Sequence, residues 1–226
     1  MTVKYRKSEV DIRQAVDVSS KKSGLDNIPT SSVNRDHMGA MEHDLIPMWT
    51  HWQYLGSGGP ASYAGITDGG RTVSASNGNN GDSIQARLGG TARGDFEVSF
   101  TPGYSWGWSV ITLVSAENWH DGHFSAWSFS PKGDKRVWIA NNSSNNQSLV
   151  QYWDGSTSKV ILETTPGGNN GNFKVWRQRG KIQVLVPGQS TVSIPDKWDA
   201  DLVVLSGNQS PHSTTINSAG RLSDSL

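Results

Sequence analysis

From residue 95 onward the chain consists of short apolar runs separated by clusters of Gly, Asn, Ser and Asp. Apolar runs of about 4–8 residues are typical of β-strands and too short for most helices. The turn-forming clusters follow one another at roughly the 8–12-residue spacing of a β sandwich. Heptads, solenoid repeats and strand–helix alternation are absent from the sequence. It therefore predicts an all-β fold, a sandwich or jelly roll.

Three stretches give the clearest strand signals. Apolar and polar residues alternate in Asp95–Phe100, so one face of that strand should be buried. Trp108–Val114 is almost continuously apolar, which indicates a strand deep in the sandwich. Arg177–Lys181 separates two apolar runs and predicts a hairpin. The other predicted strands are Ala61–Ile66, Arg71–Ala75, Ser83–Leu88, Phe124–Phe129, Val137–Ala140, Leu149–Trp153, Lys159–Leu162, Phe173–Trp176, Ile182–Val186, Val192–Ile194 and Leu202–Leu205.

The chain divides into three parts. Residues 1–48 are charged, nearly free of aromatic residues and too poor in apolar residues to form a core, so we expect an arm that docks on a neighbouring subunit. The alternation in Val10–Val18 predicts a strand suited to addition to a partner sheet, although a helix fits nearly as well. A disordered terminus is the alternative for this arm. Residues 49–60 form an aromatic patch and a Gly-Pro hinge, and residues 61–226 the sandwich, a recognition domain.

Composition limits the partners and the setting. The 20 basic and 20 acidic residues cancel, so no global positive charge points to nucleic acid. The absence of cysteine excludes disulfides and cysteine metal sites and fits assembly in a reducing cytosol. The polar, basic N-terminus has no signal-peptide pattern, and no run is long and apolar enough to span a membrane. We therefore expect neither a nucleic-acid partner nor membrane insertion.

The ten tryptophans separate into three groups by position. Those within predicted strands are expected to be core or inter-sheet rings: Trp108, Trp127, Trp138 and Trp176. Those at strand ends or turns are expected nearer the loops, either as candidate ligand-binding rings or as lids on the core: Trp106, Trp119, Trp153 and Trp198. Trp49 and Trp52 lie beside the hinge and should pack the arm against the body or a neighbour. Asn145, Asn169 and Asn170 lie in Asn-rich loops and are candidates for binding sugar hydroxyls, if those loops do more than form turns.

Catalytic and metal-binding patterns are weak. His120 and His123 flank Asp121, but no third ligand is evident, and a solvated loop is the favoured interpretation. Asp199 and Asp201, with Asp154 or Asp196, contain the oxygen donors that calcium prefers, but in no recognisable ligand order. A nucleophilic cysteine and a G-x-S-x-G elbow are both absent. We therefore predict no catalytic residues, no metal and no cofactor.

Three motifs resemble the concanavalin A-like lectin/glucanase sandwich, a superfamily that includes laminin G and SPRY-like modules. They are Gly94–Phe100, the pair Asn172–Arg177 and Gly180–Val184, and Asp201–Leu205 with Gly207. The resemblance covers residues 95–218 and implies a concanavalin-like fold. The glucanases of this superfamily carry an E-x-D-x-x-E strand, and none of the glutamates here opens that pattern. The resemblance therefore implies no paired-acid hydrolysis.

The layout as a whole resembles phage tail-fibre, receptor-binding and decoration proteins, without a diagnostic motif. We expect a non-enzymatic virion-surface attachment protein, made in the host cytoplasm. Its arm should bind other virion subunits, in a homo-oligomer such as a trimer, and its sandwich a host surface glycan or protein. A free carbohydrate-binding lectin is the alternative, followed by a polysaccharide lyase or hydrolase.

Overall fold

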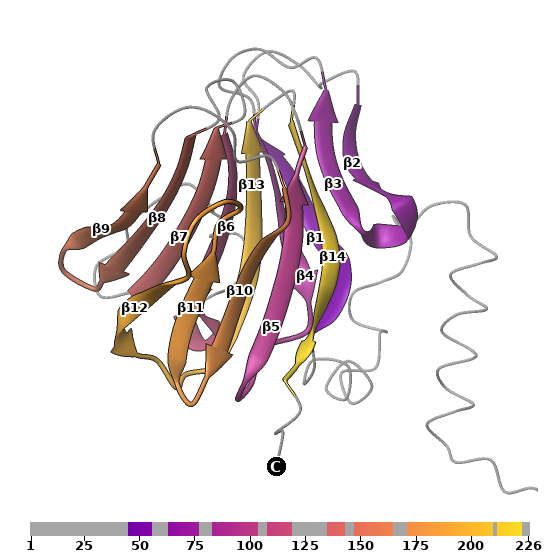
Figure 1. The fold of residues 1–226 in the computed structure, drawn as a ribbon. Coiled ribbons are helices and arrows are strands. Elements are labelled where there is room, and N and C mark those ends of the chain that lie inside the picture. The colour runs from indigo at the N-terminus through magenta and orange to yellow at the C-terminus, as the bar shows by residue number, and fades with distance from the viewer. Residues whose placement is uncertain are drawn as a thin grey trace, which may run out of the picture. The chain divides into compact units, whose positions relative to one another are not determined.

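The computed structural model describes residues 45–55, 63–76, 83–103, 108–118, 135–142, 147–164, 171–209 and 212–222. Within these ranges the chain forms two seven-stranded sheets, and their neighbouring strands pair antiparallel (Figure 1). Sheet A has the order β1-β4-β13-β6-β7-β8-β9, and sheet B the order β12-β11-β10-β5-β14-β3-β2. The predicted all-β sandwich is confirmed.

The strands are short and are joined mostly by turns and loops. Their bounds are β1 Ile46–Leu55, β2 Tyr63–Thr67, β3 Thr72–Ser76, β4 Ser83–Gly89, β5 Phe96–Pro102, β6 Trp108–Ser115, β7 Lys135–Asn142, β8 Gln147–Asp154, β9 Ser158–Glu163, β10 Phe173–Gln178, β11 Lys181–Leu185, β12 Val192–Lys197, β13 Leu202–Gln209 and β14 His212–Arg221. Two 3-10 turns accompany them, η2 at Asp68–Gly70 and η3 at Ala116–Asn118. Neither is long or apolar enough to cross a membrane, and the described residues contain no other helix.

The core lies between the inner faces of the two sheets. Phe96, Val98 and Phe100 of β5 point inward, as their alternation predicts, and are at most 3% exposed. The ring of Phe100 stacks on that of Phe173 in β10, with centroids 5.3 Å apart. Burial of such apolar area is the dominant favourable contribution to folding.

Strand β6 lies in the middle of sheet A, as its apolar run predicts. Ile111 and Leu113 point into the core between the sheets. Val110 and Val114 point to the opposite side of sheet A, yet they too are only 1% and 6% exposed. Both faces of β6 are therefore buried, which accounts for a continuous rather than an alternating apolar pattern.

The predicted hairpin is confirmed between β10 and β11, where Gln178 pairs with Lys181. Its two turn residues, Arg179 and Gly180, have positive φ angles of 52° and 75°. Positive φ at both central residues is the signature of a tight type I′ turn, whose twist matches that of the strands. The backbone N–H of Arg179 also donates to Asp95 Oδ1 at 2.8 Å, which ties the hairpin to the start of β5.

Two strands go beyond the sequence prediction. β1 begins within the residues assigned to the arm and runs through the aromatic patch, where it pairs with β4. Trp49 lies in the core, and its Nε1 donates to the carbonyl of Thr214 at 3.2 Å, whereas Trp52 is 47% exposed. β14 is rich in Ser, Thr and Asn, so its sequence has little apolar signal, yet it pairs with both β5 and β3.

Several predicted features lie outside the described residues. They are the arm up to residue 44, the Gly-Pro hinge at residues 56–60 and the predicted strand Phe124–Phe129 with Trp127. The arm and the hinge therefore stay predictions.

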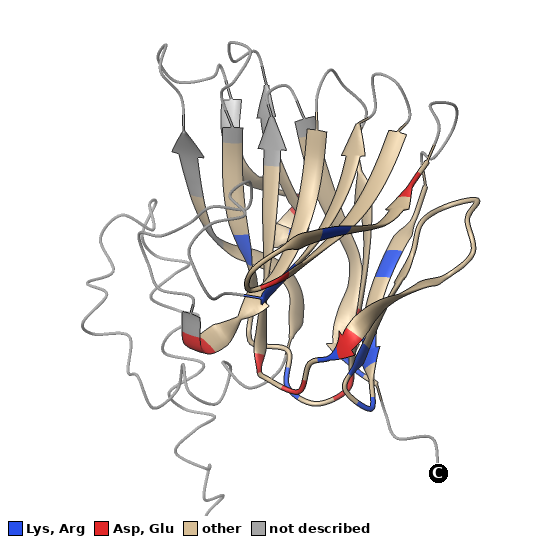
Figure 2. Ribbon diagram, turned by 90° about the vertical axis from the view of Figure 1, so that its left-hand side faces the viewer, with Lys and Arg blue, Asp and Glu red and all other residues tan. Residues whose placement is uncertain are grey.

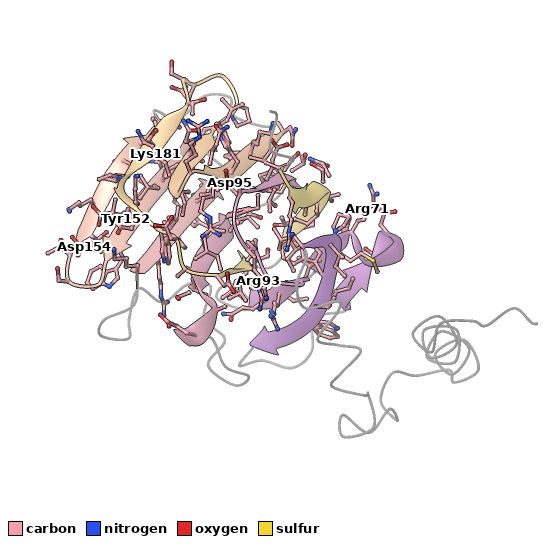
Figure 3. The ribbon with its side chains drawn as sticks, turned by 90° about the horizontal axis from the view of Figure 1, so that it is seen from below. Arg71, Arg93, Asp95, Tyr152, Asp154 and Lys181 are labelled. Atoms are coloured by element: carbon pink, nitrogen blue, oxygen red, sulfur yellow. The ribbon has the colours of Figure 1, made fainter. Side chains whose placement is uncertain are left out.

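Charged side chains are sparse along the strands and gather mainly at one end of the sandwich (Figure 2). Seen from that end, Arg71, Arg93, Asp95 and Lys181 lie with Tyr152 and Asp154 around the strand ends and turns (Figure 3). Charged residues also lie on the outward faces, among them Lys174 and Glu97 on sheet B and Glu163 on sheet A.

Candidate functional site

Three tryptophans lie together on the outward face of sheet A. Core residues Val137 and Ile139 of β7 point inward, so Trp138 between them points outward. By the strand register, Trp108 of β6 and Trp153 of β8 point to the same side as Trp138. We call the outward surface of β6, β7 and β8 the tryptophan face; each of its three rings is partly exposed.

Two of these rings approach each other closely. The centroids of Trp108 and Trp138 are 6.2 Å apart, with ring planes tilted by 30°. In the sheet they are separated by the opposed pair Val110 and Ala140, which are 1% and 0% exposed. The two rings therefore lean over this pair, and the small side chain of Ala140 leaves them room. The result is a continuous aromatic surface across β6 and β7.

Carboxamide side chains surround the rings. Asn142 lies opposite Trp108 and next to Gln147, while Gln151 lies opposite Trp138. All three face outward and are partly exposed. Aromatic rings beside a few polar donors and acceptors are the usual composition of a small-ligand site.

Trp153 Nε1 and Gln85 Oε1 are among the buried polar atoms on this side of sheet A that have no hydrogen-bond partner in the described residues. Gln85 faces outward on β4, two strands away from β6. Buried polar atoms are almost always paired, so each of these two calls for a partner. A buried water molecule would satisfy either atom.

Access to this side of the sheet is uneven. Val203 and Leu205 of β13 are 0% and 2% exposed, so the part over β13 is covered. Over β7 and β8 the tryptophan rings are partly exposed, and Val160 on β9 is 54% exposed. A ligand would therefore contact the half of the sheet that carries Trp138 and Trp153.

Carboxylates are scarce on the same surface. Among the described outward-facing residues of sheet A, Glu163 at the β9 edge is the one carboxylate, and it accepts a hydrogen bond from Gln147 Nε2 at 2.9 Å. Glycosidases place two carboxyl groups about 5–10 Å apart on either side of the scissile bond. The described part of the face can stack on and hydrogen-bond a ligand, but it contains no such pair.

The structure corrects four of the predicted tryptophan positions. Trp198 was expected near a loop rim, but it is 6% exposed and belongs to the core, so it offers little surface to a ligand. Its backbone is fixed there, since its N–H donates to the carbonyl of Gly180 at 2.7 Å. Trp108, Trp138 and Trp176 were expected in the core, but they lie partly exposed on outward faces. Strand alternation relative to Val137 and Ile139 was the signal that could have placed Trp138 correctly.

Trp153 is the one predicted site residue that the structure places on the tryptophan face. Trp106, Trp119, Asn145, Asn169 and Asn170 lie outside the described residues, so their roles stay predictions. The strand ends that flank four of them lie at the same end of the sandwich: β5 and β6 for Trp106, β7 and β8 for Asn145, and β9 and β10 for Asn169 and Asn170 (Figure 1). Trp153 lies toward the opposite end, beside the β8–β9 turn.

The candidate calcium ligands do not converge. Asp201 forms an ion pair with Arg93, with 3.0 Å between carboxylate oxygen and Nε, and Asp196 accepts a hydrogen bond from Tyr152 at 2.8 Å. Asp154 accepts from the backbone N–H of Thr157 and from Ser156, and these bonds with the Lys159 ammonium hold its pKa far below the usual range. Within the described ranges, no three His, Asp or Glu residues could hold a metal ion together. His120, Asp121 and His123 lie outside those ranges.

Comparison with known proteins informs the fold only. No protein-family model matches the sequence, and no curated protein matches it. Similar solved structures include the PSpry domain of TRIM65, with a TM-score of 0.49 and 7% identity over 84% of this chain and 98% of that chain. Arcelin-5, a lectin-like defense protein from Phaseolus vulgaris, has a TM-score of 0.49 and 10% identity over 78% and 95%.

The Bacillus licheniformis β-glucanase is also similar, with a TM-score of 0.46 and 13% identity over 80% of this chain and 97% of that chain. SPRY, lectin-like and glucanase proteins are thus all among the similar structures. At these identities the likenesses concern the sandwich and say nothing about activity.

Proposed function

We propose that the protein is a non-enzymatic recognition protein whose tryptophan face binds a glycan. The observation that carries the proposal is the placement of Trp108, Trp138 and Trp153 on neighbouring strands of one sheet face. An aromatic ring stacks on the C–H face of a sugar, and the carboxamides of Gln147 and Gln151 can bind its hydroxyls. The spread of the three rings over three strands suits an extended saccharide better than a single sugar.

The same surface supports a binding role rather than a hydrolytic one. Its described part offers one carboxylate, Glu163, at the sheet edge. A polysaccharide lyase or hydrolase would need an acid or base beside the rings. Incubating purified protein with polysaccharides of several classes should leave their chain lengths unchanged. Chain shortening that a single Glu163→Gln change abolishes would show an enzyme instead.

Binding is tested with an array of neutral and acidic glycans, followed by calorimetry on the best ligand. Trp138→Ala should weaken its affinity about tenfold or more, because binding energy concentrates in a few aromatic anchors. Trp52→Ala is the matched control, since Trp52 is 47% exposed on β1, at the far edge of sheet A. Equal affinities of the two variants would overturn the assignment of this face. Binding to a host surface protein but to no glycan would change the class of ligand.

We further propose that the protein acts on a virion surface, held by its N-terminal arm. The support is compositional: a cysteine-free chain with a charged, core-poor segment ahead of an aromatic-rich sandwich. Immunogold labelling of intact particles with antibodies to the sandwich tests this placement. Labelling only of the soluble fraction of a lysate would favour the free lectin.

A further inference from the structure

We infer a second glycan site on the outward face of sheet B, one that takes a neutral oligosaccharide. It uses residues of β10, β5 and β14, which lie side by side in the sheet that faces the viewer in Figure 1. None of these residues belongs to the tryptophan face. This second site therefore goes beyond the proposed function and can be tested independently of it.

Trp176 provides the aromatic contact. Its neighbours Val175 and Arg177 on β10 are buried, so Trp176 points outward, where it is partly exposed. Across the sheet it lies opposite Glu97, and Glu97 lies opposite Gly220 of β14. A Cβ built on Gly220 would meet no atom within 4 Å, so the surface beside Glu97 is open. A ligand that contacts Trp176 can therefore extend across Glu97 to the open surface at Gly220.

A pair of carboxamides provides the polar contact. Asn217 lies at a register shift of β14, and its Nδ2 donates to Thr101 Oγ1 at 2.9 Å and to Asn172 Oδ1 at 2.7 Å. Asn172 Oδ1 also accepts from Ser99 Oγ at 2.7 Å. These bonds fix the orientation of both side chains, although both residues are exposed.

The outward halves of the two carboxamides are available. Within the described part of the chain, Asn172 Nδ2 and Asn217 Oδ1 make no hydrogen bond. A fixed donor therefore stands next to a fixed acceptor on an exposed surface. Adjacent sugar hydroxyls, each of which both donates and accepts, match this pair, and a pre-oriented site loses less entropy on binding.

The spacing and charge define the ligand. Asn172, the residue before β10, and Trp176 on β10 are four positions apart, or about 13 Å at the rise of a strand. That distance exceeds one sugar ring, so an oligosaccharide is needed to contact both. Between them, Lys174 Nζ lies 2.7 Å from Glu97 Oε2 and 5.9 Å from the Trp176 ring centroid. This ion pair neutralises the middle of the site, which favours a neutral ligand.

The two sites would point in opposite directions, because each lies on the outer side of its own sheet. One chain could then bridge two glycan chains or bind one surface and present the other site outward. Such bivalency raises overall avidity without any new contact, provided the geometry allows both sites to engage.

Asn172→Asp is the sharpest test of this site. An aspartate keeps an oxygen that can accept from Ser99 and Asn217, and it replaces the outward Nδ2 donor by a charged oxygen that cannot donate. An array of neutral oligosaccharides identifies the ligand, and calorimetry then measures its affinity and stoichiometry. The wild-type protein should bind two ligand molecules per chain. Asn172→Asp and Trp176→Ala should each weaken one of these events about tenfold or more, with the melting temperature of Asn172→Asp unchanged.

Gln178→Ala is the control, because Gln178 is exposed on β10 beyond Trp176. Unchanged stoichiometry and affinity in Asn172→Asp and Trp176→Ala would overturn the second site. A loss of all binding in Trp176→Ala, with none in Trp138→Ala, would instead disprove the tryptophan face and keep the site on sheet B. Absence of binding to every neutral oligosaccharide in the wild-type protein would overturn this inference outright.

Discussion

Arg177 is the most deeply buried charged residue in the described part of the chain, at 1% exposure. Its guanidinium donates to the carbonyls of Gly94 at 2.6 Å, Trp198 at 3.0 Å and Ala92 at 3.3 Å, and also to Ala200. Burial lowers its pKa from the ordinary value, although nearby aspartates act against this. One side chain thus joins the segment before β5 to the segment before β13.

Arg177→Met should destabilise the fold strongly, by at least about 3 kcal/mol, because several buried carbonyls lose their donor together. Arg71→Met, at an exposed turn, should change the free energy of unfolding by less than about 0.5 kcal/mol. Urea unfolding of both variants measures the difference. Similar midpoints would mean that the carbonyls find other donors.

Tyr152 connects the two sheets at their charged end. It lies on β8 of sheet A, and its hydroxyl donates to Asp196 of β12 in sheet B at 2.8 Å. Burial, followed by the bond and the negative charge of Asp196, raises the pKa of Tyr152 well above its ordinary value. A raised pKa in the folded state means that folding favours the protonated phenol, so the stability from this contact is present below about pH 10 and is lost as pH rises further.

Tyr152→Phe should therefore lower the free energy of unfolding by about 1 kcal/mol at neutral pH. The gap between wild type and variant should narrow as pH rises above about 10, where the unfolded phenol ionises. Denaturant unfolding at a series of pH values measures that gap. A gap that stays constant to high pH would contradict a protonated Tyr152–Asp196 bond.

The arm ends where strand β1 begins, at Ile46. Leu45 and Trp49 both belong to the core, and β1 pairs with β4 over its whole length. Deleting residues 1–44 should leave the melting temperature nearly unchanged. Deleting residues 1–55 should prevent folding, because loss of a buried tryptophan alone costs about 3–5 kcal/mol. Thermal unfolding by circular dichroism distinguishes the two truncations. Unfolding of the shorter truncation would show that the arm is part of the core.

At the scale of the whole molecule, we propose that the arm makes the protein a homo-oligomer such as a trimer. Light scattering after size exclusion should give a multiple of the 24.5 kDa chain mass for the full chain, and a monomer after deletion of residues 1–44. The full chain should also bind a glycan-coated surface about 100-fold more tightly than the truncated one, through avidity. A monomeric mass for the full-length protein would contradict the proposal that the arm drives assembly.

Local sequence patterns were enough to predict the class of fold and most of its strands. Alternation set the inward face of β5, a continuous apolar run placed β6 in the middle of a sheet, and Arg179 and Gly180 supplied a tight turn. These signals are local, because the strand period and turn geometry involve residues a few positions apart. β14 gave no such signal, since its Ser, Thr and Asn residues become a strand only by pairing with β5 and β3.

Which tryptophans share a surface depends on how the strands pair in the tertiary structure. Trp108, Trp138 and Trp153 come from three strands, and the register between those strands puts them on one side of sheet A. Asn172 and Asn217 are 45 positions apart in sequence and meet through the pairing of β10, β5 and β14. The sequence around Trp198 indicates a loop, but the side chain packs in the core. Alternation within one strand can indicate which face a side chain occupies, but which side chains meet depends on the order and register of strands far apart in sequence.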